Sequence, residues 1–246
     1  SAMLMNIEFV RVLNKLTSFE AWPASPTVSI DLVDFAERPS SLKTLSLTGV
    51  DLKSPEVMED LSQLTSLCLV NFTSNVGMDF LTYFRSLRRL CLMGIRSLSW
   101  HPSCVPLTHE FLPELKLLTI DLDDRQHRHD FMRLLGGLSR LEVLGFIAAN
   151  AEGIYAQISR KELSLLKGLP DLRVLKIGCS CHSGIDFATE NLDLWSQLDS
   201  LYLASDDTEF KDSFLGTLRF RLPLLKLNRM LTGRFSFVKS FRSDSY

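Results

Sequence analysis

The stretch Leu172-Arg173-Val174-Leu175-Lys176-Ile177 carries the pattern that decides the fold. Apolar residues occupy its first, fourth and sixth positions, and the last two of these are two residues apart. A period of two is typical of a β-strand with one buried face. The same six-residue pattern recurs along the chain, which predicts a repeat protein.

Seven units match this pattern closely, and a weaker unit flanks them on each side. The seven are Leu42/Leu45/Leu47, Leu64/Leu67/Leu69, Leu87/Leu90/Leu92, Leu115/Leu118/Ile120, Leu141/Leu144/Phe146, Leu172/Leu175/Ile177 and Leu198/Leu201/Leu203. The weaker two are Leu16/Phe19/Ala21 and Leu222/Leu225/Leu227. Successive starts lie 26, 22, 23, 28, 26, 31, 26 and 24 residues apart, a spacing typical of solenoid proteins.

Helical segments are expected between the strands. Residues 159–162 (Ser-Arg-Lys-Glu) form a capping-box pattern ahead of Leu163, Leu166 and Leu169. A proline near Ser54 and an apolar stripe from Phe131 onward indicate two further helices.

A strand and a helix of this length cannot close a core alone, but stacked units can. We therefore expect an α/β solenoid curved as a horseshoe, with a parallel sheet on the concave face and helices on the convex face. Residues 1–246 should form one domain of about nine units, firm from 42 to 210. The fourth-position leucines should be buried, namely Leu67, Leu90, Leu118, Leu144 and Leu175.

These units resemble the leucine-rich repeat superfamily from about Leu16 to Leu227. The common form of that family carries Asn or Cys at the ninth position, whereas this chain has residues such as Val50, Phe72 and Ile95 there, which we expect to turn inward. The long, uneven units look most like ribonuclease-inhibitor-like and F-box-associated repeats. That resemblance implies an intracellular protein-recognition function.

Composition agrees with an intracellular globular protein. Of the 246 residues, 46% are hydrophobic and 23% are charged, with a net charge of −2. No apolar run reaches the roughly 18 residues that a membrane span needs, and residues 1–6 lack the features of a secretion signal. The odd, irregularly spaced set of five cysteines predicts reduced thiols.

The third, fifth and seventh positions of each unit should face away from the leucine core and form the recognition surface. Many of them are apolar, which indicates either a protein-binding strip or a face covered by a terminal segment or flanking domain. The partner-binding residues expected there are Val70, Met93, Leu117, Val143, Ile147, Val174, Lys176 and Tyr202. Charged substitutions centred on Met93, Leu117 and Ile147 should then abolish binding and leave the fold intact.

Three clusters that could suggest chemistry have simpler interpretations. Cys68 and Cys91 should lie side by side on neighbouring strands, where parallel side chains fit a disulfide poorly. Residues 179–182 (Cys-Ser-Cys-His) lack the second ligand pair of a zinc site. The acidic and histidine-rich residues 121–130 fit the cap of the next helix or a polar rim. We therefore predict no enzyme activity, no metal, no cofactor and no small-molecule substrate.

The C-terminal end is basic. Residues 211–246 hold eight Lys or Arg against two Asp, a balance of +6, with phenylalanines between the bases. This end is interpreted as a cap on the last repeat, or alternatively as a docking segment for an acidic protein or for nucleic acid. The candidate nucleic-acid contacts are Arg219, Arg221, Arg229, Arg234, Lys239 and Arg242, and the candidate cap rings are Phe220, Phe235 and Phe237.

The predicted function is a non-enzymatic recognition scaffold or adaptor that binds protein on its concave face. By analogy with F-box-type receptors, it could be the substrate-receptor part of a ubiquitin ligase. An RNA- or DNA-binding adaptor that uses the basic end is the alternative, and an enzyme inhibitor or regulator is a weaker one. The expected location is the cytoplasm or the nucleus, with no membrane contact.

Overall fold

The computed structural model describes residues 3–4, 16–21, 28–29, 41–49, 51–52, 61–74, 79–94, 110–121, 135–147, 158, 160–179 and 183–229. The chain divides into two compact units, residues 1–115 and residues 116–246, and each is described by itself.

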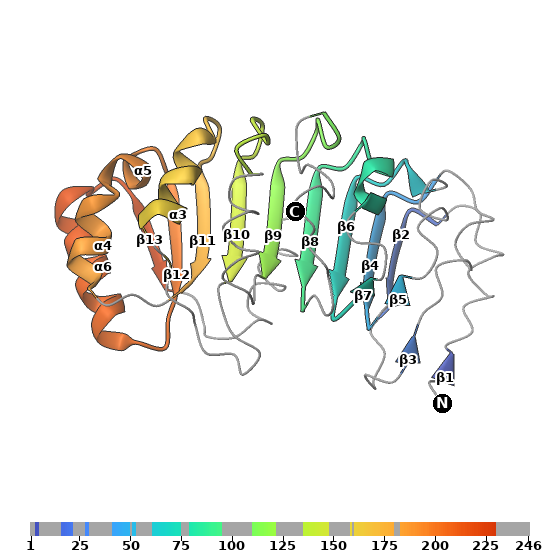
Figure 1. Ribbon diagram of the computed structural model, residues 1–246, viewed down its shortest axis with the longest axis horizontal. Helices are drawn as coiled ribbons and strands as arrows, with labels where there is room; N and C mark the ends of the chain where they lie inside the picture. The colour runs from blue at the N-terminus through green and yellow to red at the C-terminus, as the bar shows by residue number, and fades with distance from the viewer. Residues whose placement is uncertain are drawn as a thin grey trace. The chain divides into compact units, whose positions relative to one another are not determined.

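Unit 1 contains four parallel strands in the order β2 (Ser18–Ala21), β4 (Thr44–Thr48), β6 (Ser66–Val70) and β8 (Arg89–Met93) (Figure 1). Phe19, Leu45, Leu67 and Leu90 face one another in register, so the repeat alignment is correct in this unit. Two short strand pairs, β1 (Met3–Leu4) with β3 (Val28–Ser29) and β5 (Asp51–Leu52) with β7 (Thr73–Ser74), and the 3-10 helix η3 (Asp79–Tyr83) complete its described elements.

The chain leaves three neighbouring strands of unit 1 through a left-handed residue at the eighth position of the repeat. Gly49, Asn71 and Gly94 have φ values of 71°, 52° and 63°. Glycine and asparagine are the residues that adopt this conformation at least cost. The next residue after Asn71 is Phe72, which is fully buried, so the ninth position turns inward there as expected.

Unit 2 contains five parallel strands in the order β9 (Leu117–Asp121), β10 (Val143–Ile147), β11 (Val174–Gly178), β12 (Ser200–Ala204) and β13 (Lys226–Arg229). Leu118, Leu144, Leu175 and Leu201 are in register. The partner of Leu201 on the last strand is Leu227, whereas the repeat alignment expected Leu225. The expected register of the last unit is therefore wrong by two residues.

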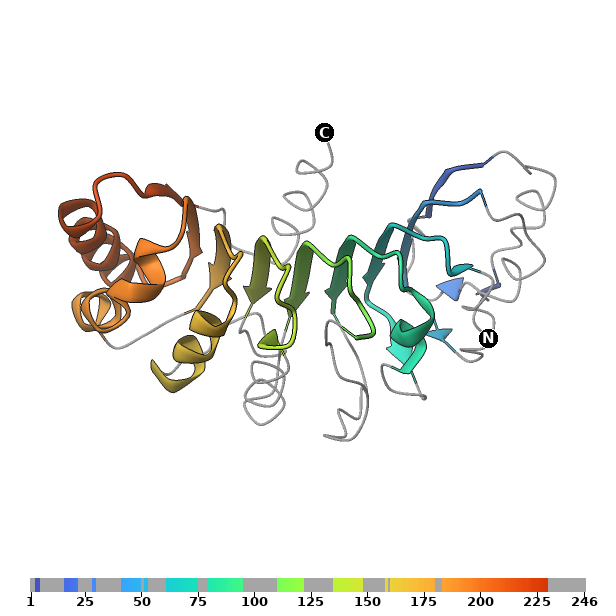
Figure 2. The same ribbon diagram turned by 90° about the horizontal axis from the view of Figure 1, so that it is seen from above.

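The leucine core follows the predicted pattern. Leu67, Leu90, Leu118, Leu144 and Leu175 are all fully buried on strands, which confirms that prediction. The helix expected after residue 159 is α3 (Arg160–Leu165), which continues into η4 (Leu166–Gly168) and buries Leu163, Leu166 and Leu169. Figure 2 shows α3 on one side of the strands of unit 2. Residues 53–60 and 122–134, where two other helices were expected to begin, lie outside the described residues.

Three helices follow β11 and make an aromatic cluster at the far end of unit 2. They are α4 (Gly184–Glu190), α5 (Leu192–Ser196) and α6 (Thr208–Arg221). Neighbouring rings among Phe187, Trp195, Phe210 and Phe214 have centroids 5.4 to 5.8 Å apart, within the range of favourable aromatic pairs. This cluster was not expected from the repeat pattern.

Parallel strands in register, a buried leucine at the fourth position of seven strands and helices between strands define the fold as an α/β leucine-rich-repeat solenoid. The prediction that residues 1–246 form a single domain stays a prediction.

Candidate protein-interaction surface

The face of each sheet that points away from the leucine core is called the outer face here. In unit 2 it displays three in-register rows, because side chains alternate along each strand. The third-position row is Leu117, Val143, Val174, Ser200 and Lys226. The fifth-position row is Thr119, Gly145, Lys176, Tyr202 and Asn228, and the seventh-position row is Asp121, Ile147, Gly178 and Ala204.

Exposure divides the predicted binding residues of unit 2 into two sets. Val143, Val174 and Tyr202 are half-buried. Leu117, Ile147 and Lys176 are buried, with 5%, 1% and 4% of their surface exposed. Of the two alternatives for these outward positions, the second set fits a covered face, whereas Val143, Val174 and Tyr202 stay candidates for contact with a partner.

The outer face of unit 1 is covered as well. Val70 and Met93 pair directly across β6 and β8, and they are 4% and 1% exposed. A glutamate at Met93, Leu117 or Ile147 would place a carboxylate in a buried site, and burial of an unpaired charge is costly. Such substitutions are therefore expected to destabilise the fold, which revises the expectation that they leave it intact. Whether Val70 and Met93 contact a partner stays a prediction.

Cys68 and Cys91 lie opposite each other on β6 and β8, as expected, and both are buried thiols. Ser46 on β4 is in register with Cys68, and its hydroxyl is buried without a hydrogen-bond partner. This row is therefore weakly polar and closed to solvent. Among the described residues, no three His, Cys, Asp or Glu side chains are grouped as a metal site.

Charged groups stand at two places on the outer face of unit 2. The Nζ atom of Lys116 lies 2.6 Å from Oε1 of Glu142, and this ion pair, half-exposed to solvent, precedes Leu117 and Val143. The ammonium nitrogen of Lys176 lies 5.4 Å from the centroid of the Tyr202 ring. The half-buried residues Val143 and Val174 thus have polar groups on both sides.

The basic end is described only in part. Arg219 and Arg221 lie exposed in the last turn of α6, and Arg229 ends β13. Phe220 is 82% exposed, so the expectation that it caps the last repeat is wrong: α6 turns Phe210, Phe214, Leu215 and Leu218 inward instead. Arg234, Phe235, Phe237, Lys239 and Arg242 lie outside the described residues.

The two remaining clusters are also only partly described. Cys179 is a buried thiol after β11, and Asp121 is buried at the end of β9. Residues 180–182 and 122–130 lie outside the described part of the chain. In the described part, no helix has the length and apolar character that a membrane span requires.

The class of protein that this fold defines is the leucine-rich-repeat solenoid. No protein-family model and no curated protein matches the chain. Among solved structures, it is similar to internalin C2 of Listeria monocytogenes at 20% identity, with a TM-score of 0.44 and coverage of 78% of this chain and 73% of that one. A second internalin of the same organism, inlF, shows 17% identity, a TM-score of 0.42 and coverage of 85% and 62%, so this chain spans less than two thirds of its length. The fold assignment rests on the strand register and the buried leucines.

Proposed function

We propose that this protein is a non-enzymatic scaffold that recognises protein partners through the outer face of unit 2. The observation that supports the proposal is the pair Val143 and Val174, which lie directly opposite each other on β10 and β11. Both side chains are half-buried, and they lie on the face of the sheet where a polar residue would not disturb the leucine core. Apolar side chains that remain open beside neighbouring strands are typical of interaction sites.

Tyr202 extends the same surface by one strand. It lies on β12 in the fifth position and is half-exposed. Tyrosine is enriched at protein interfaces because it combines a large apolar ring with a hydroxyl group that can meet water or a partner. Val143, Val174 and Tyr202 therefore form the part of the predicted binding set that a partner could reach directly.

In its finer form, the proposal is that the chain is the intracellular substrate-receptor part of a larger assembly such as a ubiquitin ligase. The irregular repeats, which resemble F-box-associated ones, support this assignment by analogy. Cys68, Cys91 and Cys179 are thiols rather than disulfide-bonded, which is compatible with a reducing compartment.

A photo-crosslinking experiment tests the proposal. With p-benzoylphenylalanine in place of Val174, irradiation of cells that express the whole chain should capture a protein, which mass spectrometry then identifies. The affinity of that purified protein for Val143→Glu/Val174→Glu should fall at least about tenfold relative to the unsubstituted chain. Lys161→Glu on the exposed side of α3 is the control and should bind normally. Unchanged affinity of the double variant, with an unchanged thermal unfolding midpoint, would contradict the proposal.

Nucleic-acid binding is the second candidate function. It is supported by the exposed pair Arg221 and Phe220, in which the guanidinium carbon lies 5.8 Å from the ring centroid. Arginine and an exposed aromatic ring are the groups that hold a single strand. Binding of single-stranded RNA that weakens with salt, at a slope of about 0.7 per phosphate neutralised, would support this candidate.

A further inference from the structure

A groove opens at the end of unit 2, away from the half-exposed valines of the third-position row. Its volume is about 570 Å³. One wall is formed by Trp195 at the end of α5 together with Leu198 and Asp199, which lead into β12. The other wall runs from Arg221 at the end of α6 through Leu224 to Lys226 at the start of β13.

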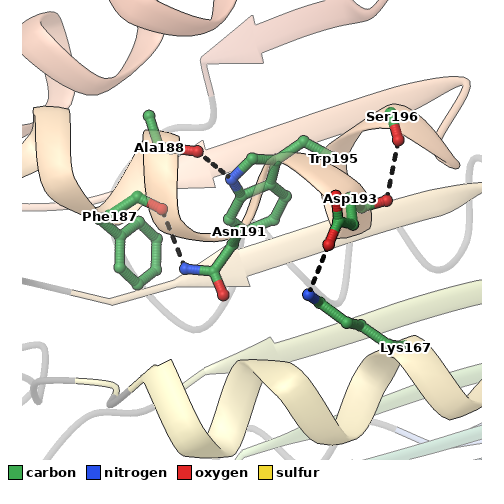
Figure 3. A network of polar contacts seen from close by, with 7 residues as sticks. All are labelled: Lys167, Phe187, Ala188, Asn191, Asp193, Trp195 and Ser196. Atoms are coloured by element: carbon green, nitrogen blue, oxygen red, sulfur yellow. Dashed lines mark hydrogen bonds and ion pairs between the residues drawn. The ribbon is translucent and has the colours of Figure 1, made fainter.

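The wall that contains Trp195 is held in place by the network drawn in Figure 3. Trp195 is fully buried, and its Nε1 donates a hydrogen bond to the carbonyl oxygen of Ala188 at 3.1 Å. Asn191 donates from Nδ2 to the carbonyl oxygen of Phe187 at 3.0 Å. Lys167 and Asp193 tie η4 to α5 through an ion pair of 3.1 Å. The Trp195 side of the groove is therefore held by contacts within the fold, and a wall that is already ordered reduces the entropic cost of binding.

The rim of the groove is apolar and open. Leu224 is 95% exposed and lies between Pro223 and Leu225 in the turn after α6. By the register of β12 and β13, Leu224 stands at the first position of the last unit, where the other units bury a leucine, yet here the neighbouring Leu225 is the buried residue. The core does not use this side chain, so it is available to a ligand.

Two of the three charged residues that line the groove are basic, and the third is Asp199. Arg221 and Lys226 are the basic pair, and Arg219 precedes Arg221 by two residues in α6; all three are exposed. Within the part of the chain that the structure describes, none of the three forms an ion pair. Arg219 and Arg221 also stabilise the carboxyl end of α6, as bases in a last helical turn do. Lys226 is on a strand, so the helix does not account for it.

From this groove we infer that the end of unit 2 binds a peptide segment that combines an aliphatic or aromatic anchor with carboxylates. The anchor would pack on Leu224 and Leu222, and the carboxylates would meet Arg221 and Lys226. The exposed apolar side chain of Leu224 favours a peptide over a nucleic-acid backbone, because a phosphate gains nothing from an apolar surface. The inference rests on the proposed function, since it adds a second contact to the same recognition scaffold.

Selection from a phage-displayed random dodecapeptide library on the whole purified chain tests the inference. The enriched peptides should contain Leu or Phe beside Asp or Glu. The best of them, labelled with fluorescein, should bind Arg221→Glu/Lys226→Glu at least about tenfold more weakly and Leu224→Ala several-fold more weakly. Arg88→Glu/Lys161→Glu carries the same change in charge at exposed positions elsewhere and should bind normally.

Three results would overturn the inference. The first is the absence of any enriched peptide, and the second is enrichment of basic peptides. The third is a 12-nucleotide uridine RNA that binds the chain more tightly than the selected peptide does, with binding that is lost in Arg221→Glu/Lys226→Glu. The partner captured at Val174 separates this inference from the proposed function. Suppose that Val143→Glu/Val174→Glu loses that partner, and that the groove variants bind both the partner and every peptide as the unsubstituted chain does. The groove inference then fails and the proposed function stands.

Discussion

Lys176 and Tyr202 lie in register on β11 and β12, with the Lys176 ammonium nitrogen 5.4 Å from the centroid of the Tyr202 ring. On the other side of Lys176 the register position is Gly145, which has no side chain to crowd the lysine. Only 4% of the surface of Lys176 is exposed. The face of the aromatic ring therefore stabilises a positive charge that has lost most of its water.

Replacing the ring should reveal this contribution. Tyr202→Leu removes the negative face of the ring and should lower the free energy of unfolding by about 0.5 to 2 kcal/mol, whereas Tyr202→Phe keeps the ring and should lose less. Urea unfolding monitored by circular dichroism measures both. Equal losses in the two variants would mean that the ring adds nothing beyond what leucine supplies, and would contradict the contribution of the aromatic face.

The core leucines should be sensitive to truncation. Leu144 is fully buried on β10 between β9 and β11, so Leu144→Ala should lower the free energy of unfolding by about 2 to 5 kcal/mol through lost apolar contact and the cavity that remains. Lys161→Ala on exposed α3 is the matched control, and its effect should stay within about 0.5 kcal/mol. Urea unfolding gives both values, and similar losses would contradict the core assignment.

The strands and their register could be predicted because they depend on a period that is visible in the sequence. The predicted register of the last unit was wrong for a local reason. The trio Leu222, Leu225 and Leu227 fits the apolar pattern better than Leu224, Leu227 and Arg229 do, but the register also depends on where the preceding helix ends. Helix α6 runs to Arg221, with the Leu222 amide bonded to the Leu218 carbonyl oxygen at 2.7 Å, and this end moves the strand two residues further along.

The candidate surface was less predictable than the core. A period of two identifies Ile147 and Val174 alike as outer-face residues, yet Ile147 is buried and Val174 is half-exposed. Whether an outward side chain meets water depends on the parts of the chain that lie over it, and no local pattern records that packing. The groove beside Leu224 was missed for the same reason, since it exists only where two distant segments meet.

The cysteines should all be reduced. Cys68, Cys91 and Cys179 are thiols, and their burial shields them from reagents in the folded state. We expect 5,5′-dithiobis-(2-nitrobenzoic acid) to titrate five thiols per chain after denaturation without reductant, and these three to react slowly before it. Elemental analysis should find no stoichiometric zinc. Three or fewer titrated thiols, or one zinc per chain, would contradict the prediction.

Two glycines in unit 2 should respond to the same substitution with opposite signs. Gly184 begins α4 and is buried against α6, where an added Cβ atom would lie only 2.7 Å from the backbone nitrogen of Phe214. Backbone atoms within α6 cannot move aside cheaply, so Gly184→Ala should force the two helices apart.

Gly216 lies within α6 itself, with open space where a Cβ atom would stand. Gly184→Ala should therefore lower the free energy of unfolding by about 1 to 3 kcal/mol through overpacking. Gly216→Ala should raise it by about 0.5 to 1 kcal/mol, because alanine loses less backbone entropy than glycine in a helix interior. Thermal and urea unfolding of the two single variants would settle both signs. A neutral Gly184→Ala would show that α4 and α6 are not in backbone contact, and that the aromatic cluster between them is packed differently.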